Sequence, residues 1–137
     1  MQISLARRRP LLCACGLLLA VAGCGPKLYP VAGTAMLDGK PLAGFVLTYN
    51  PDVEKGQKDR MDCSGRIGAD GHYALRMDDG FHNYKGVPPG WYKVTIWSPD
   101  DKPIPVNKKY TNIKMTDLSI EVVANPPPGA YDLKFSK

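Results

Sequence analysis

The sequence predicts an all-β protein whose folded part is a single antiparallel β-sandwich of about seven strands. Apolar and polar residues alternate within short segments, as they do in strands that bury one face. These segments recur every 8–12 residues or so, between turns rich in glycine, proline and aspartate, which is typical of sandwiches. No segment after residue 23 shows apolar residues at a helical period.

The first 23 residues have the composition of a secretory signal peptide. Arginines at positions 7–9 form a basic start, and Leu11–Ala22 is an apolar run of about 12 residues. A membrane-spanning helix needs roughly 20 apolar residues, so this run is too short to be one. We therefore expect residues 1–23 to be a signal peptide that is cleaved between Gly23 and Cys24.

The end of this leader, Val21-Ala22-Gly23-Cys24, resembles the lipobox of bacterial lipoproteins. The resemblance implies that Cys24 carries a diacylglyceryl group on its sulfur and a palmitate-type acyl chain on its amino group. It also implies that residues 24–30 tether the domain to a membrane of the cell envelope. A single myristoyl chain binds a membrane only reversibly, whereas three chains make attachment effectively permanent. Which membrane and which leaflet hold the anchor stays open.

Removal of the leader changes both the charge and the cysteine count. The chain has 18 Lys and Arg against 13 Asp and Glu, and the loss of three leader arginines leaves 15 against 13. No basic run marks a nucleic-acid surface, so we expect no nucleic-acid partner. Cys13 and Cys15 are removed and Cys24 is acylated, which leaves the thiol of Cys63 without a disulfide partner. We expect that thiol to be buried in the one domain, residues 31–137.

The domain opens with a predicted β-hairpin over residues 31–49. Asp38 and Gly39 are suited to the positive φ angles of a tight turn, with period-two alternation on both sides. After the turn the alternation continues through Phe45, Leu47 and Tyr49. Residues 31–44, VAGTAMLDGKPLAG, resemble the opening of carboxypeptidase-regulatory-like domains, which are small transthyretin-like sandwiches.

Two loops and two strands are expected next. Residues 50–62 are polar and form a surface loop, and residues 64–67 form a short strand. Residues 72–77 form another strand, and a second loop covers residues 78–86. The inward residues of the second strand are Tyr73, Leu75 and Met77. Residues 70–75, DGHYAL, resemble the D-G-x-Y-x-L element of the same domain family.

The strand after Pro88 and Pro89 carries the third resemblance. Residues 87–94, VPPGWYKV, resemble the L-P-P-G-x-Y-x-V element of the family. The inward residues of this strand are Tyr92, Val94 and Ile96, and the outward ones are Trp91, Lys93, Thr95 and Trp97. Residues 98–114 form a long loop. Two further strands carry Leu118, Ile120 and Val122, and Tyr131, Leu133 and Phe135.

Three side chains could in principle support catalysis: the thiol of Cys63 and the imidazoles of His72 and His82. No nucleophile motif surrounds the cysteine, and strand parity turns His72 outward. The spacing of the two histidines from Asp70, Asp78 and Asp79 fits neither zinc sites nor calcium loops. We therefore expect no metal and no cofactor.

The transthyretin-like fold also contains an enzyme, hydroxyisourate hydrolase. Its pattern has histidines near the start and ends in Tyr-Arg-Gly-Ser. This chain ends in YDLKFSK and has no histidine before His72. These departures argue against that activity.

Trp91 and Trp97 are the outward residues that most need an explanation. They lie about 20 Å apart on one strand, at 3.3 Å per residue. We expect the second sheet or the loop 98–114 to cover them, and the alternative is a stacking platform for sugars.

These observations lead to three functional hypotheses. The first is a lipid-anchored, non-catalytic module of the cell envelope that acts through an interaction or structural role, with the membrane and an envelope protein or polysaccharide as partners. The second is a carbohydrate-binding module that uses Trp91 and Trp97. The third is a small hydrolase that depends on His72 or Cys63.

Overall fold

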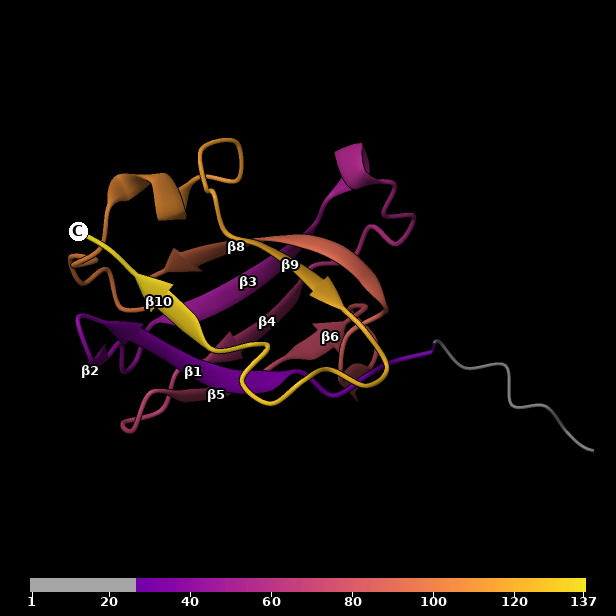
Figure 1. The fold of residues 1–137 in the computed structure, drawn as a ribbon, viewed down its shortest axis with the longest axis horizontal. Coiled ribbons are helices and arrows are strands. Elements are labelled where there is room, and N and C mark those ends of the chain that lie inside the picture. The colour runs from indigo at the N-terminus through magenta and orange to yellow at the C-terminus, as the bar shows by residue number, and fades with distance from the viewer. Residues whose placement is uncertain (1–26) are drawn as a thin grey trace, which may run out of the picture.

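The computed structural model describes residues 27–137, which fold into two packed β-sheets (Figure 1). The expected all-β sandwich is confirmed: residues 27–137 contain ten strands and, as their only helices, two short 3-10 helices, Val53–Lys55 and Lys108–Thr111. The predicted signal peptide and Cys24 lie outside the described residues. Within residues 27–137 no helix is both long and apolar enough to cross a bilayer.

The larger sheet has six strands in the order β7-β6-β4-β3-β8-β9, and every neighbouring pair is antiparallel. Its central pair joins two long strands that alternate between buried and half-buried residues, as the sequence predicted. The strands are β3 (Val46–Pro51), β4 (Cys63–Arg66), β6 (Arg76–Asp78), β7 (Asn83–Lys85), β8 (Gly90–Trp97) and β9 (Ser119–Val122).

The smaller sheet is built around β1 (Ala32–Leu37). This strand pairs antiparallel with β2 (Lys40–Pro41) and β5 (His72–Ala74), and parallel with β10 (Leu133–Phe135). The parallel pair departs from the expectation of a purely antiparallel sandwich. It arises because β10 follows a crossover from β9 in the other sheet and then runs alongside β1 in the same direction.

The first hairpin is shorter than expected. Asp38 and Gly39 form the predicted turn, with φ angles of 49° and 76°. The strand after the turn pairs over only two residues, and Leu42 then enters the core. The segment that contains Leu47 and Tyr49 is β3 of the larger sheet, so the prediction of one hairpin over residues 31–49 was wrong.

The predicted strand over residues 72–77 is shared between the two sheets. Its first half, β5, pairs with β1, and its second half, β6, pairs with β4. Leu75 lies at the switch, and its N–H donates to the carbonyl of Val31 at 2.9 Å. Tyr73, Leu75 and Met77 are all buried, as their spacing predicted. The predicted loop over residues 78–86 in fact contains a strand, β7, because the chain turns back at once to pair with β6.

Three tyrosines connect the two sheets inside the core. The hydroxyls of Tyr49 in β3 and Tyr73 in β5 lie 2.9 Å apart, and the Tyr73 hydroxyl donates to the carbonyl of Tyr131 at 2.5 Å. Tyr73 has one hydroxyl hydrogen, so Tyr49 must be the donor of the first bond. Burial raises the pKa values of Tyr49 and Tyr73 above their usual range.

Candidate functional site

The outer face of the larger sheet carries the residues from which a binding site can be built. In β8 the side chains opposite the core are Trp91, Lys93, Thr95 and Trp97. In the middle of this face Asn50 of β3 lies opposite Lys93, and its amide donates to the hydroxyl of Thr95 at 3.0 Å. This central part is therefore a hydrogen-bonded polar floor.

Two loops rise on either side of this floor. One begins at Asp52, whose N–H donates to the carbonyl of Trp91 at 2.9 Å, and continues into the 3-10 helix Val53–Lys55. The other is the turn 112–116, whose Thr116 hydroxyl donates to the carbonyl of Val94 at 2.7 Å. Hydrogen bonds thus fix both loops to β8.

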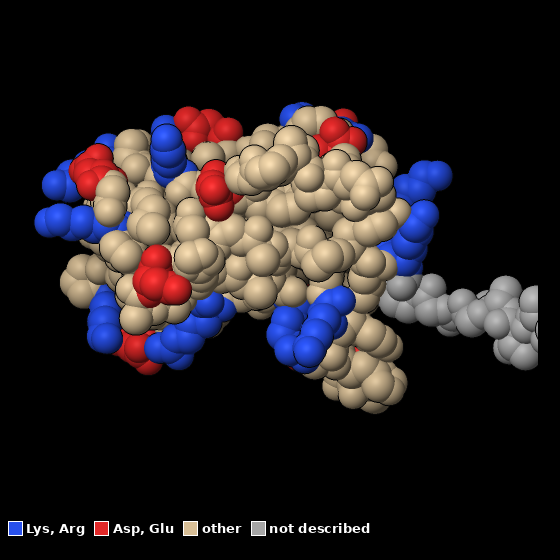
Figure 2. Space-filling view, turned by 60° about the horizontal axis from the view of Figure 1, so that its bottom comes forward, with Lys and Arg blue, Asp and Glu red and all other residues tan. Residues whose placement is uncertain are grey.

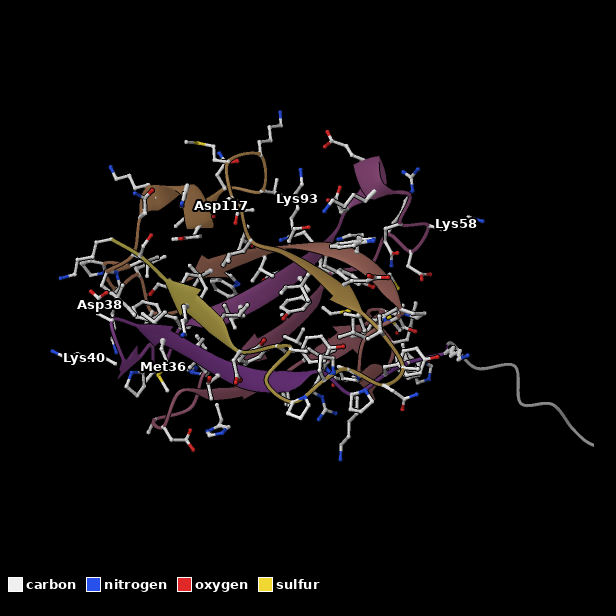
Figure 3. All side chains as sticks on the ribbon, in the orientation of Figure 1. Met36, Asp38, Lys40, Lys58, Lys93 and Asp117 are labelled. Atoms are coloured by element: carbon white, nitrogen blue, oxygen red, sulfur yellow. The ribbon has the colours of Figure 1, made fainter. Side chains whose placement is uncertain are left out.

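A groove of about 460 Å³ lies between these two loops. We call it the β8 groove. It is lined by Pro51, Asp52, Val53, Glu54, Lys93, Ile113 and Lys114. Figure 3 shows Lys93 extending outward from the sheet between the two loops. The groove is open to solvent, and its size matches the lower part of the range for small-ligand sites.

Charge in the β8 groove is carried by two cations, Lys93 and Lys114, and two carboxylates, Asp52 and Glu54. The Lys93 ammonium lies 3.5 Å from Glu54 Oε2. Asp52 is only 4% exposed, and its carboxylate has no hydrogen-bond or ion-pair partner among residues 27–137. No buried side-chain oxygen within residues 27–137 lacks a partner, so the carboxylate oxygens of Asp52 reach solvent and can accept hydrogen bonds from a ligand in the groove.

The rims of the β8 groove are apolar. Val53 on one side and Ile113 on the other are among the few exposed large hydrophobic residues, and Met115 is exposed in the same turn as Ile113. An open groove with apolar rims and a few polar groups at its floor is the arrangement found in many binding sites. It can hold a ligand that offers hydrogen-bond donors to Asp52 and apolar surface to the rims.

The two tryptophans do not form one platform. The Lys55 ammonium lies 3.9 Å from the centre of the Trp91 ring and donates to the Ser119 hydroxyl at 2.9 Å. Trp97 lies at the other end of β8, opposite Val46, and is 48% exposed. The expectation that the second sheet or the loop 98–114 covers both rings is therefore wrong: a lysine lies over one, and the other is half exposed.

Cys63 and the two histidines face different surroundings. Cys63 is fully buried, as expected, and this burial raises the pKa of its thiol to about 12. His72 lies on the surface, with Nδ1 3.0 Å from Asp70, and His82 lies 3.6 Å from Asp79. In the part of the chain that the structure describes, no three His, Cys, Asp or Glu side chains are grouped as metal ligands.

Sequence reasoning located Lys93, Trp91 and Trp97 on the outer face, but it missed the β8 groove. Asp52 and Val53 fell in a segment assigned as a polar surface loop, and Ile113 fell in the long loop 98–114. The only sign of the groove in the sequence was Val53, an apolar residue within a charged loop. No repeat of apolar residues along the sequence could link the two loops, because they are about 60 positions apart and are brought together by their hydrogen bonds to β8.

On the face drawn in Figure 2, Lys and Arg side chains lie around an uncharged centre, and on the left side they are interspersed with Asp and Glu. This mixture agrees with the near balance of charge in residues 24–137, which have 15 Lys and Arg against 13 Asp and Glu. No family model, no curated protein and no solved structure matches this chain.

Proposed function

We propose that the protein is a lipid-anchored, non-catalytic binding module of the cell envelope, with Cys24 as the anchor and the β8 groove as the binding site. The observation that carries the binding role is the β8 groove itself, where the Asp52 carboxylate has no protein partner within residues 27–137 and its oxygens reach solvent. The anchoring role comes from the lipobox-like residues 21–24. The partner is an envelope protein or polysaccharide that presents hydrogen-bond donors.

The environment of the potential catalytic groups supports a non-catalytic role. A thiol with a pKa near 12 is almost entirely protonated at neutral pH, and the thiolate is the nucleophilic form. The imidazole of His72 faces solvent, whereas the Cys63 side chain faces the core. A hydrolase that depended on either residue would lose turnover in His72→Ala or Cys63→Ala.

The anchor is tested with Cys24→Ala in the native host. The unaltered protein should enter the detergent phase on phase partition, and Cys24→Ala should keep its leader and lose the acyl chains. Cys63→Ala is the matched control, because its thiol is buried and it should partition as the unaltered protein does. Because the retained leader is itself apolar, the deciding measurement is the mass of each protein, and an unaltered protein without acyl chains would contradict the anchor.

The binding site is tested by crosslinking in intact envelopes. A photoreactive residue in place of Ile113, at the rim of the β8 groove, should give a discrete adduct that Asp52→Ala abolishes. The same residue in place of Lys40 should give no such adduct, since Lys40 lies at one end of the sandwich, away from the groove (Figure 3). Equal adducts from both positions, or none from Ile113, would contradict the assignment.

A second candidate function, carbohydrate binding, is favoured by one observation: Trp97 is half exposed beside the outward Thr95 of the same strand. An exposed indole ring offers a flat apolar face for a sugar ring. Titration with envelope polysaccharides should then change tryptophan fluorescence in Trp91→Phe but not in Trp97→Phe. The absence of any change with every glycan would discard this function.

A further inference from the structure

Phe81 is the most exposed large hydrophobic residue in the described chain, at 92%. It lies at the tip of the hairpin formed by β6 and β7, in a turn that is held by hydrogen bonds. Asp79 Oδ1 accepts from the N–H groups of Phe81 at 2.9 Å and His82 at 2.6 Å, and Asp78 Oδ1 accepts from Gly80 at 2.8 Å. The hydrogen-bonded turn therefore holds the phenyl ring in solvent. Such an exposed aromatic side chain needs a functional explanation.

The same hairpin carries two cations directly opposite each other. Arg76 in β6 and Lys85 in β7 are register partners, so their side chains lie on the same face. Like charges in this position destabilise a strand pair. Arg76 Nε donates to the amide oxygen of Asn83, and neither cation has a carboxylate partner within residues 27–137. An anionic group placed between the guanidinium and the ammonium would relieve this repulsion.

The hairpin lies at the end of the sandwich at which the described chain begins. Tyr29, just before β1, exchanges two hydrogen bonds of 2.9 Å with Val87, just after β7. β5 is antiparallel to β1 and leads into β6, so β6 runs toward the end at which the chain enters the domain (Figure 1). Phe81 is six residues from this bridge, and the five-residue step from Tyr29 back to Cys24 in the sequence spans at most about 20 Å.

We propose that the β6–β7 hairpin is a second membrane contact, in which Phe81 enters the interface of the bilayer and Arg76 and Lys85 bind lipid phosphates. The inference rests on the lipid anchor proposed above and adds an orientation to it. Anchoring keeps the hairpin at a high local concentration of lipid, so one aromatic ring and two cations suffice. Arg76 and Lys85 lie on the outer face of the larger sheet, which also carries the β8 groove three strands away.

The test uses the mature, acylated protein in vesicles, with an environment-sensitive dye at His82→Cys beside an intact Phe81. The buried Cys63 thiol does not compete for the dye. In vesicles of phosphatidylethanolamine and phosphatidylglycerol the emission should shift to the blue, and lipids that carry a quencher in the bilayer should quench the dye. The control is a dye at Lys40→Cys. Lys40 lies in β2, at the opposite end of the sandwich from the end toward which β6 runs (Figure 1), so this dye should show neither effect.

Phe81→Ala should lower the ratio of docked to undocked hairpin roughly 10- to 100-fold, as expected for loss of a buried phenyl ring. Arg76→Gln combined with Lys85→Gln should lower the same ratio in anionic vesicles and leave it unchanged in vesicles of phosphatidylcholine. Mass measurement first confirms the acyl chains, which separates failure of the anchor from failure of the docking. A dye that stays water-exposed on the acylated protein, or that is shielded only when another envelope protein is added, would overturn the proposal.

Discussion

Removing the Tyr73 hydroxyl tests how the two sheets are held together. In Tyr73→Phe the ring still fills its place in the core, but two hydrogen bonds disappear. The Tyr49 hydroxyl loses its acceptor, and the Tyr131 carbonyl loses its donor. Both groups lie in the interior, where no other protein group in the described chain replaces the lost partner.

The cost follows from the two groups that are left unpaired. A buried polar group without a partner costs about 1–3 kcal/mol, so Tyr73→Phe should lower the free energy of unfolding by about 2–4 kcal/mol. Tyr49→Phe removes one donor and should cost about 1 kcal/mol. In Tyr73→Phe the Tyr49 hydroxyl is already unpaired, so adding Tyr49→Phe to that variant removes an unpaired buried group and should restore part of the lost stability. The double variant should therefore be more stable than Tyr73→Phe alone.

Urea unfolding followed by tryptophan fluorescence measures these differences. Tyr73→Phe should move the midpoint down by roughly 1–2 M at an unchanged slope. The double-mutant cycle should give a coupling energy of about 1–3 kcal/mol between the two positions. Additive effects of the two substitutions would refute this account of the tyrosine bridge.

Three further outcomes are expected. Burial raises the pKa of the Cys63 thiol from 9.0 to about 12, so above pH 9 the folded state keeps a proton that the unfolded state loses. The contribution of this group to the free energy of unfolding should be constant below pH 9 and then fall by about 1.4 kcal/mol per pH unit. Cys63→Ala should therefore show a shallower fall in stability when urea unfolding is repeated at alkaline pH. Gly33→Ala should lower the free energy of unfolding by more than about 2 kcal/mol, because a Cβ there would overlap the Tyr131 carbonyl. The control in the same urea assay is Gly44→Ala, where a Cβ would meet open space. That control should cost only the strain of its left-handed backbone. Lys55→Met should leave the fold intact and shift Trp91 emission, measured in a Trp97→Phe background, since the ammonium above the ring is lost.

The alternation of apolar residues predicted which side chains are buried more reliably than which strands pair. The inward sets in β3, β5–β6 and β8 are confirmed, and so is the turn at Asp38-Gly39. Alternation of apolar and polar residues shows only which face of a strand each side chain occupies, because it arises from side-chain direction and not from the identity of the neighbouring strand. It therefore does not show that Leu75 marks a change of sheet or that β10 lies parallel to β1.

The candidate sites were predictable only in part, for a related reason. Parity placed Lys93 and Trp97 on the outer face, and both are found there. The exposure of Phe81 depends on a turn closed by Asp78 and Asp79 within a segment assigned as a loop. Asp52 is held against β8 by the hydrogen bond from its N–H to the carbonyl of Trp91, which is distant in sequence. The turn at Phe81 is held by hydrogen bonds between residues two or three positions apart, whereas the position of Asp52 depends on a tertiary contact that a single sequence does not display.

The central claim is that a β-sandwich binding module is fixed to a bilayer through one cysteine, and the mass of the native protein tests it most directly. The account predicts an intact chain that begins at Cys24, with a mass increased by a diacylglyceryl group and one further acyl chain. A native chain that begins at Met1 with an unmodified Cys24 thiol would contradict it.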